Sequence, residues 1–141
     1  GAVFTPTLYA CAVSVNGVSD LPLMLRKVEL KSGGDSDLLL YWRNHIGDAM
    51  DPEVIAKSPA RQAYEAKAPI LLMHGEDDSV VPIEHSELMA RKLADAQRPH
   101  RLVRLEGEDH WLTQAATRIR MLRELEAFLA GQLLPASPPT P

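Results

Sequence analysis

The sequence lacks the features that mark several classes of protein. It has one cysteine in 141 residues, which excludes an internal disulfide and a zinc site built from cysteines. Aromatic residues make up only 5% of the chain, and no apolar run reaches the length of a membrane span. The 15 basic and 19 acidic residues give a net charge of −4, so no excess of basic charge favours nucleic acid or an anionic membrane as a partner.

The central stretch of the chain, residues 68–82, has the pattern of a strand, an acidic loop and a helix. Ile70–Met73 is apolar without polar alternation, which is typical of a strand buried on both faces of a parallel sheet. Asp77 and Asp78 follow this strand, at the end where α/β sheets carry their functional groups. Pro82 then suits the first turn of a helix. The pattern predicts an α/β fold with a carboxylate at the sheet edge.

A second unit of the same kind follows about thirty residues later. His100–Leu105 has the more polar pattern of an edge strand, and it leads through an acidic loop to His110 before a helix begins near Thr113. In right-handed βαβ units the loops after successive parallel strands open on the same edge of the sheet. We therefore expect a loop aspartate to lie where it orients the imidazole of His110.

Four phrases of the sequence resemble one family of enzymes. They are HGEDDSVVP at 74–82, EGEDH at 106–110, YWRNHIGD at 41–48 and SPA at 58–60. They resemble the carboxyl-terminal third of an α/β-hydrolase of the prolyl oligopeptidase family, which includes the dipeptidyl and acylaminoacyl peptidases. The resemblance implies a partial α/β-hydrolase fold over residues 1–134, with about three parallel strands and flanking helices in three αβα layers.

The same resemblance implies the roles of two side chains. The family's chain order is serine, acid, histidine, which assigns the acid to Asp78 and the histidine to His110. The sequence contains no G-x-S-x-G, and residues 1–4 resemble the end of the helix that follows this serine turn. We therefore expect the chain to begin just after the nucleophile. It would be the carboxyl-terminal fragment of a serine peptidase acting on peptides, inactive alone, without cofactor or metal.

Each of these residues also has a simpler interpretation. Asp78 has the position of a helix cap, and Asp77 is a rival acid that we expect to be capping or solvated. His74 is expected to be structural, with its ring bonded to nearby backbone. A metal site made of His74, Asp78, His85 and His110 has none of the ligand spacings that make such an assignment specific. The joint position of Asp78 and His110 after successive strands favours catalysis.

Two other functions remain open from the sequence. In one alternative, the hydrolase of which this chain would be a fragment acts on esters, since the same triad hydrolyses both esters and peptides. In the other, the chain is a non-catalytic α/β interaction module, an interpretation that the missing serine turn favours. A complete sequence would separate peptidase from esterase if it carried a β-propeller ahead of the hydrolase domain.

The remaining pattern predicts one further strand, the helices and a tail. We expect a strand at Tyr9–Val15, a helical crossover over 18–67 and a mobile proline-rich tail at 135–141. Two helices are expected to bury an apolar stripe against the sheet. These stripes are Leu88, Met89, Leu93 and Ala96 in one helix and Ile119, Leu122, Leu125, Phe128 and Leu129 in the other. With no neighbour for its first strand, the chain is expected to self-associate through the exposed sheet edge.

Overall fold

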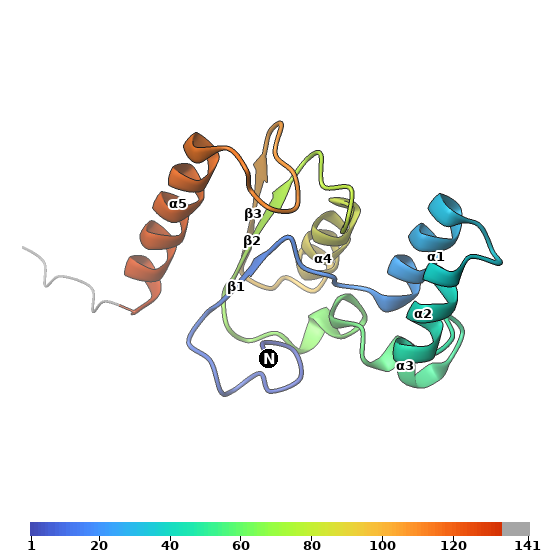
Figure 1. Cartoon of the computed structure of the whole chain (residues 1–141). Coiled ribbons are helices and arrows are strands. Elements are labelled where there is room, and N and C mark those ends of the chain that lie inside the picture. Colours follow the sequence, from blue (N-terminus) through green and yellow to red (C-terminus); the bar gives the residue numbers. More distant parts are fainter. Residues whose placement is uncertain (134–141) are drawn as a thin grey trace, which may run out of the picture.

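Three strands form a parallel sheet at the centre of the molecule (Figure 1). They are β1 (Ala12–Val15), β2 (Ile70–Gly75) and β3 (His100–Leu105), and they lie side by side in chain order. The computed structural model describes residues 1–133. The predicted tail at 135–141 lies outside the described residues, so the tail and the domain boundary stay predictions.

The central strand β2 is buried on both faces, as its apolar run predicts. Ile70 and Leu72 pack on one face with Met89 and Leu93 of α4 (Glu84–Asp95). The alternate residues, Leu71 and Met73, form a second apolar cluster on the face toward α5 (Ala115–Leu133). Figure 1 shows α4 and α5 on opposite sides of the sheet. The predicted three-layer arrangement is confirmed.

The crossover between β1 and β2 consists of four short helical elements. They are α1 (Leu21–Ser32), α2 (Asp37–Ile46), α3 (Pro52–Ala56) and the 3₁₀ helix η1 (Pro59–Glu65). Asp20 caps α1 by accepting a hydrogen bond from the Leu23 N–H at 2.8 Å. The first two helices bury an apolar cluster of their own, made of Met24, Leu25, Val28 and Leu39. These elements all lie within the helical crossover that the sequence predicts over 18–67.

The first strand is shorter than its sequence predicts. The small and β-branched pattern covers Tyr9–Val15, whereas β1 begins at Ala12. Ala12 pairs with Ile70, which is the first residue of β2. The residues before Ala12 therefore have no strand beside them, and Tyr9 is exposed.

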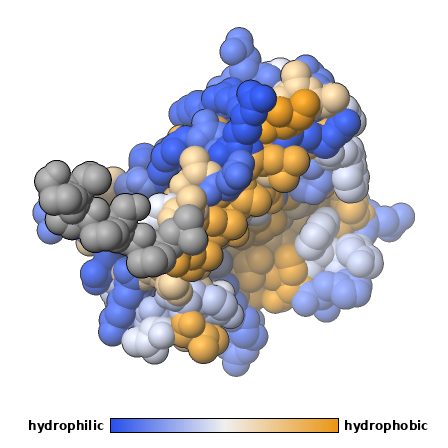
Figure 2. Space-filling view, turned by 90° about the vertical axis from the view of Figure 1, so that its left-hand side faces the viewer, coloured by the Kyte–Doolittle hydropathy of each residue, from blue (hydrophilic) through white to orange (hydrophobic). Residues whose placement is uncertain are grey.

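The prediction for the last helix is wrong in part. Met121, Leu125 and Phe128 of α5 pack partly buried against the sheet, but no residue of this helix is fully buried. Ile119 is 51% exposed and Leu122 56% exposed, because the described sheet is too narrow to cover the whole stripe. Apolar side chains consequently gather on this face of the molecule (Figure 2). Neither α5 nor any other helix in the described part of the chain is long and apolar enough to cross a membrane.

Candidate active site

The loop after β2 holds Asp78 in a fixed orientation. Its side chain is fully buried, and its Oδ1 accepts hydrogen bonds of 2.8 Å from the N–H groups of both Val80 and Val81. An aspartate readily makes this local bond to the backbone two and three residues ahead. Asp78 thus caps its own loop rather than α4, whose first turn has no side-chain cap. The two backbone bonds do not engage its second oxygen, Oδ2, which is buried as well.

Asp78 Oδ2 lies 2.7 Å from Nδ1 of His110, which follows β3. A carboxylate only accepts hydrogen bonds, so Nδ1 carries the proton and donates it. The other ring nitrogen, Nε2, makes no hydrogen bond to residues 1–133. The imidazole is about one quarter exposed, with 23% of its side-chain surface accessible. The structure therefore brings the two predicted side chains together and leaves Nε2 available as a base.

Asn16 connects the end of β1 to the end of β2 and to the loop after β3, beside this pair. Its Oδ1 accepts from the Gly75 N–H at 2.9 Å, and its Nδ2 donates to the carbonyl of His110 at 2.9 Å. The backbone of Asn16 adopts a left-handed conformation with φ of 50°, which asparagine tolerates better than most residues. In the sequence, the pair Asn16-Gly17 is typical of a turn and indicates none of these contacts. The one available signal was an asparagine at the carboxyl end of a strand.

Gly75 allows the two functional loops to approach each other. A Cβ at this position would lie 2.4 Å from the carbonyl oxygen of Glu108 and 2.8 Å from that of Asp109. The close contact also lets the Asp77 N–H donate to the Glu108 carbonyl at 3.0 Å. The acid loop is thereby attached to the histidine loop through the backbone.

Glu108 attaches the histidine loop to the start of α5. Its side chain is fully buried, and its Oε1 accepts from the Gln114 N–H at 3.1 Å. Burial by itself raises the pKa of this carboxyl, but hydrogen bonds from Gln114, Thr117 and Thr113 outweigh burial and hold the pKa below its ordinary value. Glu108 therefore holds the residue before α5 through Oε1, while its Oε2 is buried without a hydrogen-bond partner among the described residues. Sequence reasoning did not single it out.

The other predicted candidates lie elsewhere or have other partners. Asp77 is exposed, and its carboxylate makes no hydrogen bond within the described residues. His74 is buried and bonds the backbone, as expected, and also the hydroxyl of Ser86. In residues 1–133 no group of three or more histidine, cysteine, aspartate or glutamate side chains is arranged to hold a metal ion.

His85 belongs to a separate buried contact in the first turn of α4. Its Nδ1 accepts from the Ser19 N–H at 3.4 Å, and the Ser19 hydroxyl donates to its carbonyl at 2.6 Å. Burial lowers the pKa of His85 to about 4, which the nearby charge of Asp20 only partly opposes. The ring is therefore neutral near neutral pH and links α4 to the loop after β1.

Two exposed apolar side chains flank the Asp78–His110 pair. Trp111 is 74% exposed, and its ring lies edge-on to the imidazole of His110 with centroids 5.1 Å apart. Leu112 follows in the left-handed region, with φ of 52°, which buries the leucine while the tryptophan stays outside. On the other side, Val80 borders a mostly apolar pocket of about 490 Å³. This pocket is also lined by Met24, Val28, Leu38 and Trp42.

Comparison with known proteins supports the resemblance seen in the sequence. The model of the prolyl oligopeptidase family matches residues 1–135. The uncharacterized peptidase YtmA of Bacillus subtilis (strain 168) is 29% identical over 126 residues, which cover 87% of this chain and 46% of that protein. The chain thus spans about half the length of this curated relative.

Solved structures of peptidases have the same arrangement of strands and helices. A puromycin-hydrolyzing peptidase of Mycobacterium tuberculosis is similar with a TM-score of 0.71 and 29% identity, over 88% of this chain and 18% of that one. The acylaminoacyl peptidase of Pyrococcus horikoshii gives a TM-score of 0.76 at 24% identity, over 99% and 22% of the two chains. The predicted α/β-hydrolase architecture is confirmed, and the chain belongs to the prolyl oligopeptidase family.

Proposed function

We propose that this chain supplies the acid and the base of a serine peptidase, with Asp78 as the acid and His110 as the base. The observation that carries the proposal is the 2.7 Å hydrogen bond between them, which leaves Nε2 of His110 unbonded among the described residues. The Ser–His–Asp mechanism uses this arrangement, an imidazole whose tautomer is fixed by a buried carboxylate. Membership of the prolyl oligopeptidase family favours peptides as the substrates.

In the proposed reaction the bond to Asp78 keeps the proton of the neutral imidazole on Nδ1. Nε2 of His110 takes the proton of a serine hydroxyl as the serine oxygen bonds to the peptide carbonyl carbon. The imidazolium then returns that proton to the leaving amine when the peptide C–N bond breaks. Asp78 stabilises the positive charge that His110 carries between the two transfers. Water later releases the acyl group from the serine by the same steps.

The nucleophilic serine is proposed to come from a segment outside these 141 residues. The sequence holds no G-x-S-x-G, and no serine of residues 1–133 is hydrogen-bonded to His110. Ser86, Ser19 and Ser58 are buried in other contacts. The chain by itself is therefore expected to be inactive.

The test compares the isolated chain with the full-length gene product. We expect the full-length protein to hydrolyse short peptide anilides and to be labelled on a serine by a fluorophosphonate, and the chain alone to do neither. Changing His110 to alanine in the full-length protein should lower kcat by about 10⁶-fold. An unchanged rate in that variant would contradict the proposal. Hydrolysis of simple esters without hydrolysis of any peptide would favour the esterase alternative.

We also propose that the isolated chain self-associates through the free edge of β1. The N–H groups of Ala12 and Asn16 donate toward β2, to the carbonyls of Pro69 and Met73. Backbone groups alternate along a strand, so the N–H groups of Val13 and Val15 point away from β2. Within residues 1–133 no strand pairs with this edge. An unpaired edge of this kind is a template for a strand of a second copy.

Replacing Val15 with proline should abolish this association. Proline removes the outward N–H, while the β1–β2 hydrogen bonds are kept because Val15 does not donate to β2. By light scattering, we expect the mass of the unchanged chain to rise with concentration toward twice 15.5 kDa and that of the variant to stay at one chain. Val15→Thr keeps the N–H and serves as the control. A monomeric unchanged chain at high concentration would refute the proposal.

A further inference from the structure

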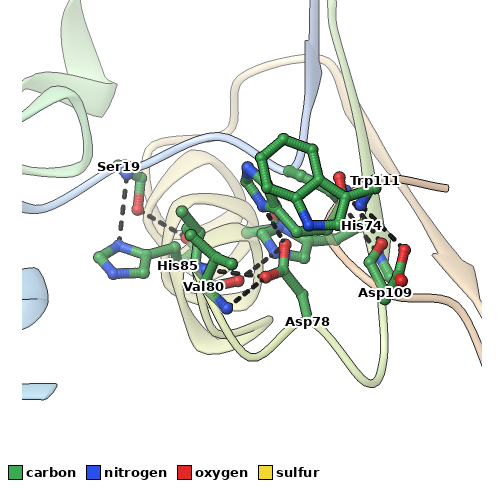
Figure 3. Close-up of polar contacts among 12 residues, drawn as sticks. Ser19, His74, Asp78, Val80, His85, Asp109 and Trp111 are labelled. Atoms are coloured by element: carbon green, nitrogen blue, oxygen red, sulfur yellow. Dashed lines mark hydrogen bonds and ion pairs between the residues drawn. The ribbon is translucent and has the colours of Figure 1, made fainter. Parts of the chain in front are cut away.

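A second histidine, His74, contacts the loop that carries Asp78. It lies at the end of β2, is fully buried, and both of its ring nitrogens have partners. Nδ1 is 2.7 Å from the hydroxyl oxygen of Ser86 in the first turn of α4. Nε2 is 2.8 Å from the carbonyl oxygen of Val81 and 3.4 Å from Oδ2 of Asp78. The ring thus connects the sheet, the acid loop and the following helix (Figure 3).

The partners of His74 determine where its proton lies. The carbonyl oxygen of Val81 only accepts a hydrogen bond, so Nε2 must carry a proton and donate it. In the neutral ring Nδ1 then has a lone pair, which accepts from the hydroxyl of Ser86. The Val81 carbonyl therefore fixes the tautomer of His74 that donates toward the acid loop, and Ser86 provides the matching donor to Nδ1. The same N–H is the closest histidine donor to Asp78 after His110.

The peptide groups of Val81 transmit this contact to Asp78. The Val81 N–H donates to Asp78 Oδ1 at 2.8 Å, and the Val81 carbonyl accepts from His74. The N–H and the carbonyl of Val81 are thus both hydrogen-bonded, which fixes the turn. In this turn Asp78 Oδ2 is directed at His110. The connection runs from Ser86 through His74 and Val81 to Asp78 without leaving buried surroundings.

We propose that His74 is a positioning residue for the proposed triad and that Ser86 anchors its ring by donating to Nδ1. His74 orients Asp78 through Val81, and Asp78 in turn keeps the proton of His110 on Nδ1. This inference rests on the proposed function for its catalytic consequence. Its structural part concerns only the tautomer of His110 and is measurable in the isolated chain.

The first measurement is the ¹⁵N spectrum of the histidine rings in the isolated chain at a pH where His110 is neutral. We expect His110 in the unchanged chain to hold its proton on Nδ1. In the His74→Phe variant, which keeps a buried ring but no polar atoms, we expect the Nδ1–H form to lose population to the Nε2–H form. Ser86→Ala should shift the population in the same direction by less, and Ser86→Thr should restore it.

Ser19, which also contacts the first turn of α4, provides a matched control for the Ser86 variant. Ser19→Ala also removes a buried hydroxyl that bonds the first turn of α4, but its partner is the carbonyl of His85. This variant should leave the tautomer of His110 unchanged. If the His74 and Ser86 variants fold and keep His110 in the Nδ1–H form, His74 is only a packing residue and the inference is wrong. The milder Ser86→Ala decides the question if His74→Phe fails to fold.

The second measurement separates this inference from the proposed function. In the full-length protein, His74→Phe should lower kcat about 10²-fold with little change in KM, because small misplacements of a catalytic group have effects of this size. A tautomer shift in a full-length protein without hydrolase activity would support the positioning role and refute the proposed function. An active full-length protein whose kcat does not respond to His74→Phe would refute the positioning role alone.

Discussion

Replacing Asp78 with asparagine is expected to reduce kcat of the proposed hydrolase by about 10⁴-fold while the fold is retained. The asparagine oxygen still accepts from the N–H groups of Val80 and Val81, so the loop keeps its shape. Its amide nitrogen then faces Nδ1 of His110, and because it only donates, it stabilises the tautomer with the proton on Nε2. That form of His110 cannot take a proton from serine.

The measurement is the steady-state kinetics of the full-length protein on a peptide anilide. Asp77→Asn is the matched control, because it is the same chemical change one residue earlier on an exposed side chain. We expect it to leave kcat within a factor of about two, as for a surface substitution away from the reacting groups. If Asp77→Asn reduced the rate and Asp78→Asn did not, the assignment of the acid would be wrong.

The second large effect is expected on stability. Gly75→Ala should lower the free energy of unfolding by about 3 kcal/mol, the upper part of the range for overpacked sites. The new Cβ would lie 2.4 Å from the Glu108 carbonyl oxygen, a backbone atom that cannot rotate away. The acid loop and the histidine loop would have to separate. The same variant is therefore also expected to weaken the hydrogen bond between Asp78 and His110.

Urea denaturation of the isolated chain measures this effect, and Gly131→Ala is its control. Gly131 lies inside α5, and a Cβ added there meets no atom within 4 Å. Because alanine favours the helix over glycine, this variant should be stabilised by about 0.5–1 kcal/mol. The same added methyl group is thus expected to have opposite effects at the two positions. A Gly75→Ala variant as stable as the unchanged chain would show that the two loops do not need their close contact.

The sequence predicted the elements whose signals are local. Ile70–Met73 has an uninterrupted apolar run, and Pro82 and the glycines mark helix boundaries, so β2 and most helices were predictable. The meeting of Asp78 and His110 was predictable because successive parallel strands end at one edge of a sheet. Their catalytic roles stay a prediction that the proposed experiments test.

The features that were missed depend on distant parts of the chain. Asn16 bonds residues more than fifty positions away, and no pattern around it indicates these partners. Nothing in the sequence around Glu108 distinguishes it from an exposed acidic residue, although its side chain is fully buried. The length of β1 depends on where β2 begins, and the burial of α5 depends on the width of the sheet. The periodicity of apolar residues within one segment gives neither the start of a neighbouring strand nor the width of the sheet.

The acid and the histidine are only 32 residues apart, within a single strand–helix–strand unit. Contacts between residues close in sequence close small loops and form early in folding. We therefore expect Asp78 and His110 to meet before Asn16 joins them from 94 residues away. The hydrogen bond that orients the proposed base, His110, would then form without help from segments distant in the sequence. Changes in those distant segments would affect the position of the nucleophile and leave this hydrogen bond in place.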